Sequence, residues 1–91
     1  MRKLVVKDFP VTIVGNQGTG WRIANEAEKQ TRTLLFDFEI EDSGGGCLLV
    51  YHSKPHELYA DDWYESKETA IQVANDYFGI PIDTWEENFE I

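Results

Sequence analysis

The stretch TLLFDFEIED, residues 33–42, alternates large apolar side chains with carboxylates. Successive side chains of a β-strand point to opposite faces, so this pattern predicts a strand with one buried face and one solvated face. Strands of this kind are typical of antiparallel sheets. The apolar side chains that share the predicted buried face are Leu34, Phe36, Phe38 and Ile40.

The segments on either side of this strand also read as strands. The apolar run CLLVYHS (47–53) follows the glycine-rich segment DSGGG, and glycine accepts the positive φ angles of a tight connection. We therefore predict that residues 33–52 form a β-hairpin. Alternation also predicts strands within 2–9 and 9–15. Residues 21–28 fit a strand or a short helix, and Trp21 and Ile23 after a glycine-rich turn favour the strand. The intervening GNQGTG lacks the glycine order of a phosphate-binding fingerprint, so it is interpreted as a turn.

One amphipathic helix is predicted over about residues 67–78. Apolar side chains recur there at helical spacing between Ala70 and Phe78. Ser66 is placed as the N-cap, and Gly79 is placed as the left-handed residue that ends the helix. The predicted fold class is α+β, with an antiparallel sheet of about four to five strands packed by this helix.

A short second helix is predicted near the C-terminal end of the sequence. The segment DTWEE (83–87) shares with DDWYE (61–65) an indole between carboxylates. Asp83 and Glu86 have the three-residue offset of a capping box. This spacing predicts a helix over about residues 84–89.

Length and composition indicate a single domain, residues 1–91. The chain is 42% hydrophobic and 13% aromatic, which is enough for a compact core at this size. A single cysteine excludes a disulfide framework within the chain and is typical of a reducing compartment. No apolar run approaches the ~18 residues of a membrane span, and charged residues interrupt the N-terminal run too early for a signal peptide. We expect a cytoplasmic protein with no membrane partner.

The net charge of -9 is confined to the C-terminal third of the chain. Residues 1–56 carry seven basic and seven acidic side chains, whereas residues 57–91 carry ten acidic side chains and one basic. Because phosphate contacts need Lys and Arg, no nucleic acid is expected as a partner. The charge permits a basic protein partner, and the alternative is an acidic surface that only keeps the protein in solution.

We predict a partner-binding surface around the two tryptophan-containing segments. Aromatic anchors within a charged rim are typical of protein interfaces. The predicted surface comprises Asp61, Asp62, Trp63, Tyr64, Trp85, Glu86 and Glu87. The alternative is that both indoles pack onto the predicted helix, with the carboxylates in solvent. No catalytic residue, cofactor or enzymatic activity is predicted, because paired carboxylates need a cleft to separate their pKa values.

An alternative function is metal or ligand binding by Cys47, His52, His56 and the carboxylates near them. His52 and His56 would share a helix face, but Pro55 between them breaks a helix. On a strand, Cys47 and His52 point to opposite faces. A zinc site would therefore require residues 52–57 to fold back as a loop.

Residues 61–85, DDWYESKETAIQVANDYFGIPIDTW, resemble the C-terminal module of short, poorly characterised bacterial α+β domains. The matching residues are Asp61, Trp63, Ser66, Ala70, Ala74, Phe78, Gly79, Ile80 and Trp85. Some of these domains resemble immunity proteins encoded beside toxins, so the resemblance implies a binding protein without a catalytic motif. Many members have a histidine where this chain has Tyr64, so no role of that ring is carried over.

The sequence leaves two oligomeric states open, a monomer and an edge-strand homodimer. Pro10 lacks a backbone donor, which favours an edge position for its strand. The strand at 47–52 is a second candidate edge, because residues 53–60 are assigned neither to a strand nor to a loop.

Overall fold

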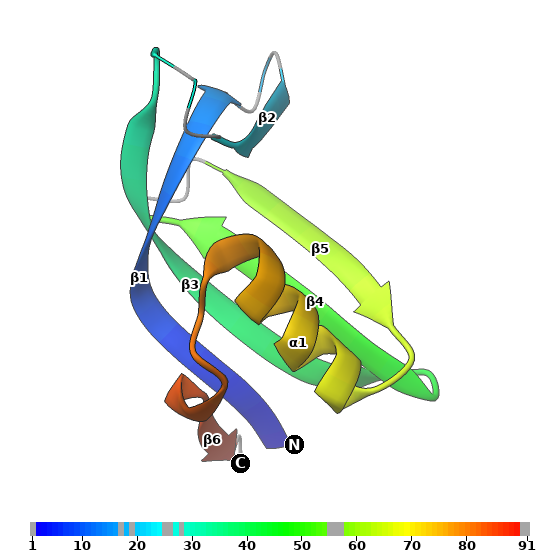
Figure 1. Ribbon diagram of the computed structural model, residues 1–91. Coiled ribbons are helices and arrows are strands. Elements are labelled where there is room, and N and C mark those ends of the chain that lie inside the picture. The colour runs from blue at the N-terminus through cyan, green and yellow to red at the C-terminus, as the bar shows by residue number, and fades with distance from the viewer. Residues whose placement is uncertain are drawn as a thin grey trace.

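The computed structural model of the protein describes residues 2–16, 18, 20–24, 27, 29–54 and 58–89. These residues form six strands, one α-helix and one short 3-10 helix (Figure 1). The elements are β1 (Arg2–Asn16), β2 (Gly20–Ile23), β3 (Arg32–Ser43), β4 (Gly46–Ser53), β5 (Tyr59–Tyr64), α1 (Lys67–Phe78), η1 (Ile82–Thr84) and β6 (Glu86–Phe89). All strand pairs are antiparallel, in the order β2-β1-β3-β4-β5, and β6 also pairs with β1. The α+β prediction is confirmed, although the sheet is larger than predicted.

The predicted hairpin is formed by β3 and β4. Phe38 pairs with Tyr51, and the connection turns at Gly44 and Gly45, whose φ angles are 56° and 89°. The alternation of β3 is as predicted, since Phe36 and Phe38 are fully buried on the face that α1 covers. Asp37, Glu39 and Glu41 occupy the opposite face, whereas Asp42, near the end of the strand, lies on the same face as its partner Cys47.

The helix α1 has the predicted bounds and the predicted caps. The Ser66 side chain accepts a hydrogen bond from the Thr69 amide at 3.1 Å. Gly79 has a φ angle of 74° and its amide donates to the Asn75 carbonyl at 3.0 Å. Ala70 and Ala74 are fully buried, and their small side chains bring the helix close to the sheet.

β1 is one continuous strand, whereas the sequence predicts two strands, within 2–9 and 9–15. Val6 pairs with Phe38 and Phe9 pairs with Phe36, so three steps along β1 match two along β3. This β-bulge includes Asp8, which has a φ angle of 55°. The extra residue reverses the alternation, so that Val6 and Phe9 both face the core.

The prediction of a second helix over residues 84–89 is wrong. A 3-10 turn ends at Thr84, and residues 86–89 form β6 beside the first residues of β1. So short an isolated helix is marginal in water, whereas pairing with β1 satisfies the backbone of both strands. Trp85, between these elements, packs against the core, and its indole N–H has no hydrogen-bond acceptor within the described part of the chain.

The predicted edge at 47–52 is wrong, because β4 has neighbours on both sides. The predicted edge at Pro10 holds locally, because none of the described strands pairs with the outer side of β1 at that residue. The Leu35 carbonyl accepts from the Lys54 amide at 2.9 Å, so Leu35 turns its polar groups toward β4. The backbone nitrogen and carbonyl of Pro10, which pairs with Leu35, therefore point away from β3. On the outer side of β1, β2 pairs only with residues from Ile13 onward, and β6 pairs only with residues up to Val5. The missing N–H of Pro10 therefore removes no hydrogen bond between these strands.

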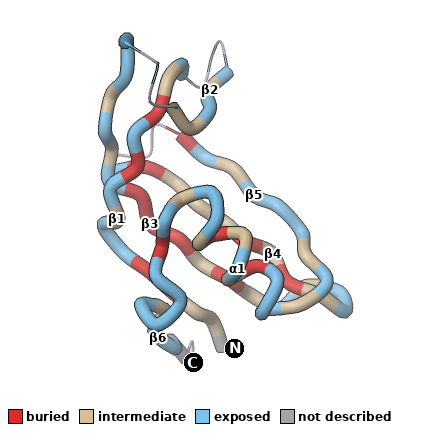
Figure 2. The backbone as a smooth tube through the Cα atoms, in the orientation of Figure 1, coloured by how far each residue is buried: buried red, intermediate tan, exposed pale blue. Residues whose placement is uncertain are grey.

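The core lies between α1 and the concave face of the curled sheet (Figure 2). The convex face carries exposed apolar side chains, among them Leu35, Tyr59 and Trp63. Within the residues that the structure describes, no helix combines the length and the apolar character needed to cross a membrane.

Candidate functional site

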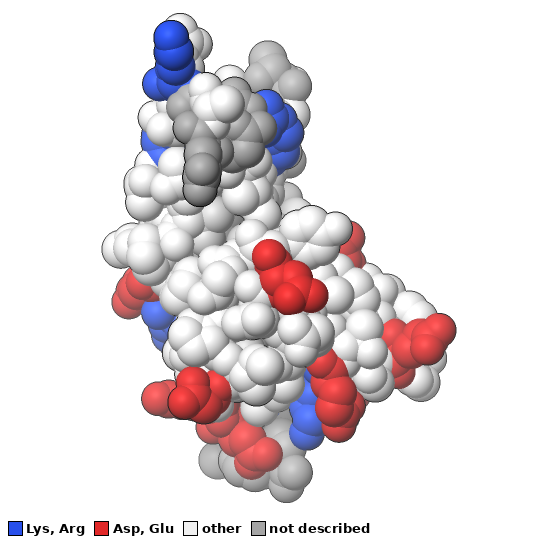
Figure 3. Space-filling model, viewed as in Figure 1, with Lys and Arg blue, Asp and Glu red and all other residues white. Residues whose placement is uncertain are grey.

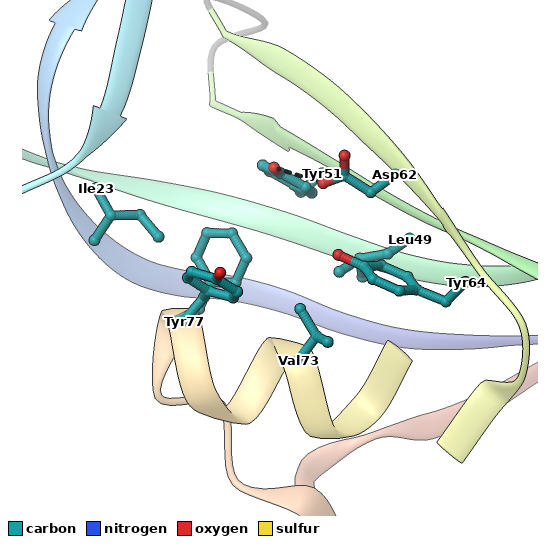
Figure 4. Close-up of a pocket in the computed structure, with 8 residues that line it drawn as sticks. Ile23, Leu49, Tyr51, Asp62, Tyr64, Val73 and Tyr77 are labelled. Atoms are coloured by element: carbon teal, nitrogen blue, oxygen red, sulfur yellow. Dashed lines mark hydrogen bonds between the residues drawn. The ribbon is translucent and has the colours of Figure 1, made fainter. Parts of the chain in front are cut away.

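A groove opens on the concave side of the sheet, between α1 and strands β2, β4 and β5 (Figure 4). It consists of two adjoining cavities of about 310 and 470 Å³. Both are lined by Ile23, Tyr51, Tyr77 and Phe78. Ligand sites are typically concave and mostly apolar with a few polar groups, so this groove is the candidate site.

Strand alternation places a carboxylate at the rim of this groove. On β5, Asp62 pairs with Leu49 and Tyr64 pairs with Cys47, so both side chains point to the side that α1 covers. Their neighbours Asp61 and Trp63 point to the convex face. Asp62 therefore lines the smaller cavity, while Arg22 lines the larger one.

Aromatic rings form the floor of the groove. The ring centroids of Tyr51 and Phe78 are 5.0 Å apart, and those of Trp21 and Tyr51 are 6.0 Å apart. Phe38 lies beneath Tyr51 and Phe78, with centroid distances of 5.5 Å to Tyr51 and 4.8 Å to Phe78. These contacts fix the orientation of the rings that line the groove.

The Asp62 carboxylate lies among phenol groups. Tyr51 Oη donates a hydrogen bond to Asp62 Oδ2 at 3.4 Å, and Figure 4 shows the Tyr64 and Tyr77 rings around the same space. Burial, followed by the charge of Asp62, raises the pKa of Tyr51 to about 12. Burial raises the pKa of Tyr64 as well, with smaller contributions from Asp62 and Tyr77. Near neutral pH the groove thus holds one negative charge bordered by neutral aromatic rings.

Alkaline pH is expected to destabilise the fold through Tyr51. Its pKa is raised from 10.0 to about 12 in the folded protein. The stability that this shift contributes is fully present below pH 10.0 and is lost as the pH rises through about 12. Chemical denaturation over this range should show a falling free energy of unfolding, and Tyr51→Phe should flatten the fall. The difference in stability between the two proteins at pH 7 serves as the reference for the slope.

The structure separates the seven residues predicted as one partner-binding surface. Asp62 and Tyr64 line the groove, whereas Asp61 and Trp63 lie on the convex face. Trp85, Glu86 and Glu87 belong to the segment beside β1, across the sheet from β5. The two tryptophan-containing segments therefore do not form a single surface.

Trp63 has a structural role on the convex face. Its indole N–H donates to the Ser43 carbonyl at 3.0 Å, and a Cβ at Gly46 would collide with its ring. The expectation that Trp63 packs on the helix is wrong, because its position on β5 directs it to the uncovered face. The indole instead covers the turn of the hairpin.

The residues of the metal-binding alternative are not brought together. Cys47 is buried on the core side, where burial and then Asp42 raise the pKa of its thiol. His52 is on the convex face, with Nε2 3.7 Å from Asp37 Oδ2. His56 lies outside the described residues. Among the residues that are described, no group of three or more potential ligands is placed to hold a metal ion.

A second cluster of charges holds the β-bulge on the convex face. The Asp8 amide donates to Asp37 Oδ1 at 3.0 Å, and Lys54 Nζ lies 2.8 Å from Asp8 Oδ1 and 3.3 Å from Asp37 Oδ2. The hydrogen bond to Asp8 is the main reason that the pKa of Lys54 is raised. These groups satisfy one another, so the cluster stabilises the bulge.

Sequence reasoning missed the groove residues Trp21, Tyr51 and Tyr77. The alternation of 47–53 does place Tyr51 on the same face as Cys47 and Leu49. The contact between β2 and the end of α1 depends on the curl of the sheet, which no local pattern encodes.

Comparison of the chain with protein-family models, with curated protein sequences and with solved structures finds no match.

Proposed function

We propose that the chain is a non-enzymatic protein-binding module whose groove receives a Lys or Arg side chain of a basic partner. The observation that carries this proposal is the position of the Asp62 carboxylate, which accepts a hydrogen bond from Tyr51 at the rim of a groove that Tyr64 and Tyr77 also line. We further propose a cytoplasmic setting and a role like that of immunity proteins, in line with the resemblance of residues 61–85.

The chemistry of the groove favours an organic cation. The face of an aromatic ring attracts Lys or Arg within about 6 Å of its centroid, and the attraction is stronger where water is excluded. Asp62 adds a full negative charge, and Tyr51 Oη already occupies one of its oxygens. The cavity that Asp62 lines is about 310 Å³, at the lower end of the size range of ligand pockets. A single basic side chain is the expected occupant.

The charge distribution favours a basic protein over a small neutral ligand. The chain carries a net charge of -9. In Figure 3 the acidic side chains lie over the half of the molecule that holds α1 and β6, and basic ones gather at the end that holds β2. A field of this kind accelerates the encounter with a cationic partner and aligns it before contact. Arg22 lines only the larger cavity, so the cation is expected at the Asp62 end.

Neighbouring carboxylates on β5 allow a matched test of the groove. We expect an acetylated, amidated lysine derivative to shift the NMR signals of the Tyr51, Tyr64 and Tyr77 rings. Asp62→Asn should weaken this binding by about threefold to fivefold, because Asp62 is an exposed carboxylate at the rim of the groove and an exposed ion pair contributes up to about 1 kcal/mol. Asp61→Asn makes the same change of net charge on the convex face and should leave the affinity within about twofold, because its carboxylate lies on the opposite side of β5 from the groove.

Two outcomes of this experiment would contradict the proposal. Equal weakening by Asp61→Asn and Asp62→Asn would indicate attraction to the overall negative charge, without a site in the groove. Shifts confined to residues outside the groove would have the same meaning.

A further inference from the structure

We propose that the basic partner binds as an extended strand along the outer edge of β5, which carries its basic side chain into the groove. This inference rests on the proposed function and specifies how the partner is held. It follows from the hydrogen-bonding direction of β5, from the faces of its two aspartates and from their charge.

The direction of the β5 backbone follows from the contacts of Leu58. The Ser53 amide of β4 donates to the Leu58 carbonyl at 3.0 Å, and the Leu58 amide donates to Ser53 Oγ at 2.9 Å. The amide and carbonyl of one strand residue point to the same side, and this side alternates along the strand. Asp62 therefore faces β4, whereas Asp61 and Trp63 turn their amides and carbonyls outward.

No described strand pairs with this outward side. β5 is the last strand of the sheet order, and its pairs are all with β4. Figures 1 and 2 show it along the outside of the sheet, with α1 on the concave side of β4 and β5. The outer edge at Asp61 and Trp63 can accept an additional strand, a mode of peptide recognition in which backbone bonds supply affinity and alternate side chains supply specificity.

A strand in this position would place side chains on both faces of the sheet. Side chains at opposite positions of neighbouring strands lie about 5 Å apart. Every second side chain of the added strand would therefore lie beside Asp62 and Tyr64 at the groove. The other set would lie beside Asp61 and Trp63 on the convex face. Two adjacent basic residues in the partner would therefore each lie next to an aspartate of β5.

The same charges argue against a second copy of this chain on the edge. Antiparallel pairing of β5 with itself would bring the aspartates of one copy next to those of the other, and like charges in cross-strand positions are destabilising. Charged side chains on an edge strand also suppress indiscriminate pairing. Asp61 and Asp62 thus exclude acidic and apolar strands while favouring a basic one.

Backbone methylation of a synthetic peptide tests the strand directly. The probe is the capped hexapeptide Thr-Val-Lys-Arg-Val-Thr, together with two forms methylated on alternate backbone nitrogens. One form blocks the nitrogens that face β5, and the other blocks those that face away. We expect one methylated form to lose at least about tenfold in affinity, because several hydrogen bonds are removed together, and the other to bind like the parent peptide.

Amide hydrogen exchange on the unmodified protein supplies the second readout. The parent peptide should slow exchange at the Asp61 and Trp63 amides, which face outward, by at least about tenfold. The Ala60 and Asp62 amides already face β4 and should change little. Protection in this alternating pattern, with binding lost by one methylated peptide only, would establish the added strand.

Other results separate this inference from the proposed function. If the lysine derivative shifts the groove tyrosines but the peptide leaves the Asp61 and Trp63 amides unprotected, the strand is wrong and the cation site stands. Equal binding by all three peptides also overturns the strand. If neither the lysine derivative nor the peptide binds, both proposals are wrong.

Discussion

Replacing Phe38 with alanine is expected to lower the free energy of unfolding by about 3–5 kcal/mol, the range for large core aromatics. Phe38 is fully buried, and its ring contacts those of Phe9, Phe36 and Phe78. The Phe38 ring also stacks on Tyr51, which lines the groove. Removal of the ring therefore leaves a cavity directly beneath the groove. Chemical denaturation measures the loss, which is a large fraction of the 5–15 kcal/mol of a typical domain.

Leu35→Ala on the same strand is the matched control. Leu35 points to the uncovered face and is 45% exposed, so its truncation should cost less than about 1 kcal/mol. The Phe38 variant, where it remains folded, should also bind the lysine derivative more weakly, because Tyr51 and Phe78 lose their support. Similar losses of stability in both variants would mean that the two faces of β3 are wrongly assigned.

Replacing Asp37 with alanine is expected to lower the free energy of unfolding by about 2–3 kcal/mol. The Asp37 side chain is only 12% exposed and accepts the amide of Asp8 within the β-bulge. Loss of this acceptor leaves a shielded N–H without a partner, at a cost of about 1–3 kcal/mol. It also removes the contact that supports the positive φ angle of Asp8, a conformation that non-glycine residues seldom adopt. Urea denaturation at neutral pH measures the change.

Two further variants separate the role of the acceptor from that of the charge. Asp37→Asn keeps an oxygen for the Asp8 amide and should lose less than half as much stability. Asp8→Gly keeps the amide and relieves the backbone strain but removes the exposed ion pair with Lys54, so the stability should change by less than about 1 kcal/mol. A loss for Asp37→Ala no larger than that for Glu39→Ala would contradict this account. The Glu39 carboxylate shares the convex face and pairs with Lys3 at 3.3 Å, but its side chain is more exposed.

The fold was predictable where local patterns and the tertiary structure agree. The alternation of 33–42 and the caps at Ser66 and Gly79 predict β3 and α1, because burial on one face and satisfied helix ends are local requirements. The bulge at Asp8 was not predictable in this way. A single extra residue shifts the alternation, and the sequence then reads as two strands when the partner strand is unknown.

The remaining differences arise from contacts between distant segments. The capping spacing of Asp83 and Glu86 predicts a helix, but pairing with β1 is stronger than a short isolated helix. For the candidate site, the sequence identified Asp62 and Tyr64 but grouped them with Trp63 and Trp85. Only the sheet register shows that Asp62 faces Leu49 and the helix, while Trp63 covers Gly46 on the other side.

The pairing of β6 with the beginning of β1 has a consequence for the order of folding. The Arg2–Phe89 pair joins residues separated by nearly the whole chain, whereas β3 and β4 meet across a turn of two glycines. Closing the longer loop carries the larger entropic penalty, and the hairpin can form before it. β6 has only four residues, so its ladder is among the parts of the sheet that open most readily.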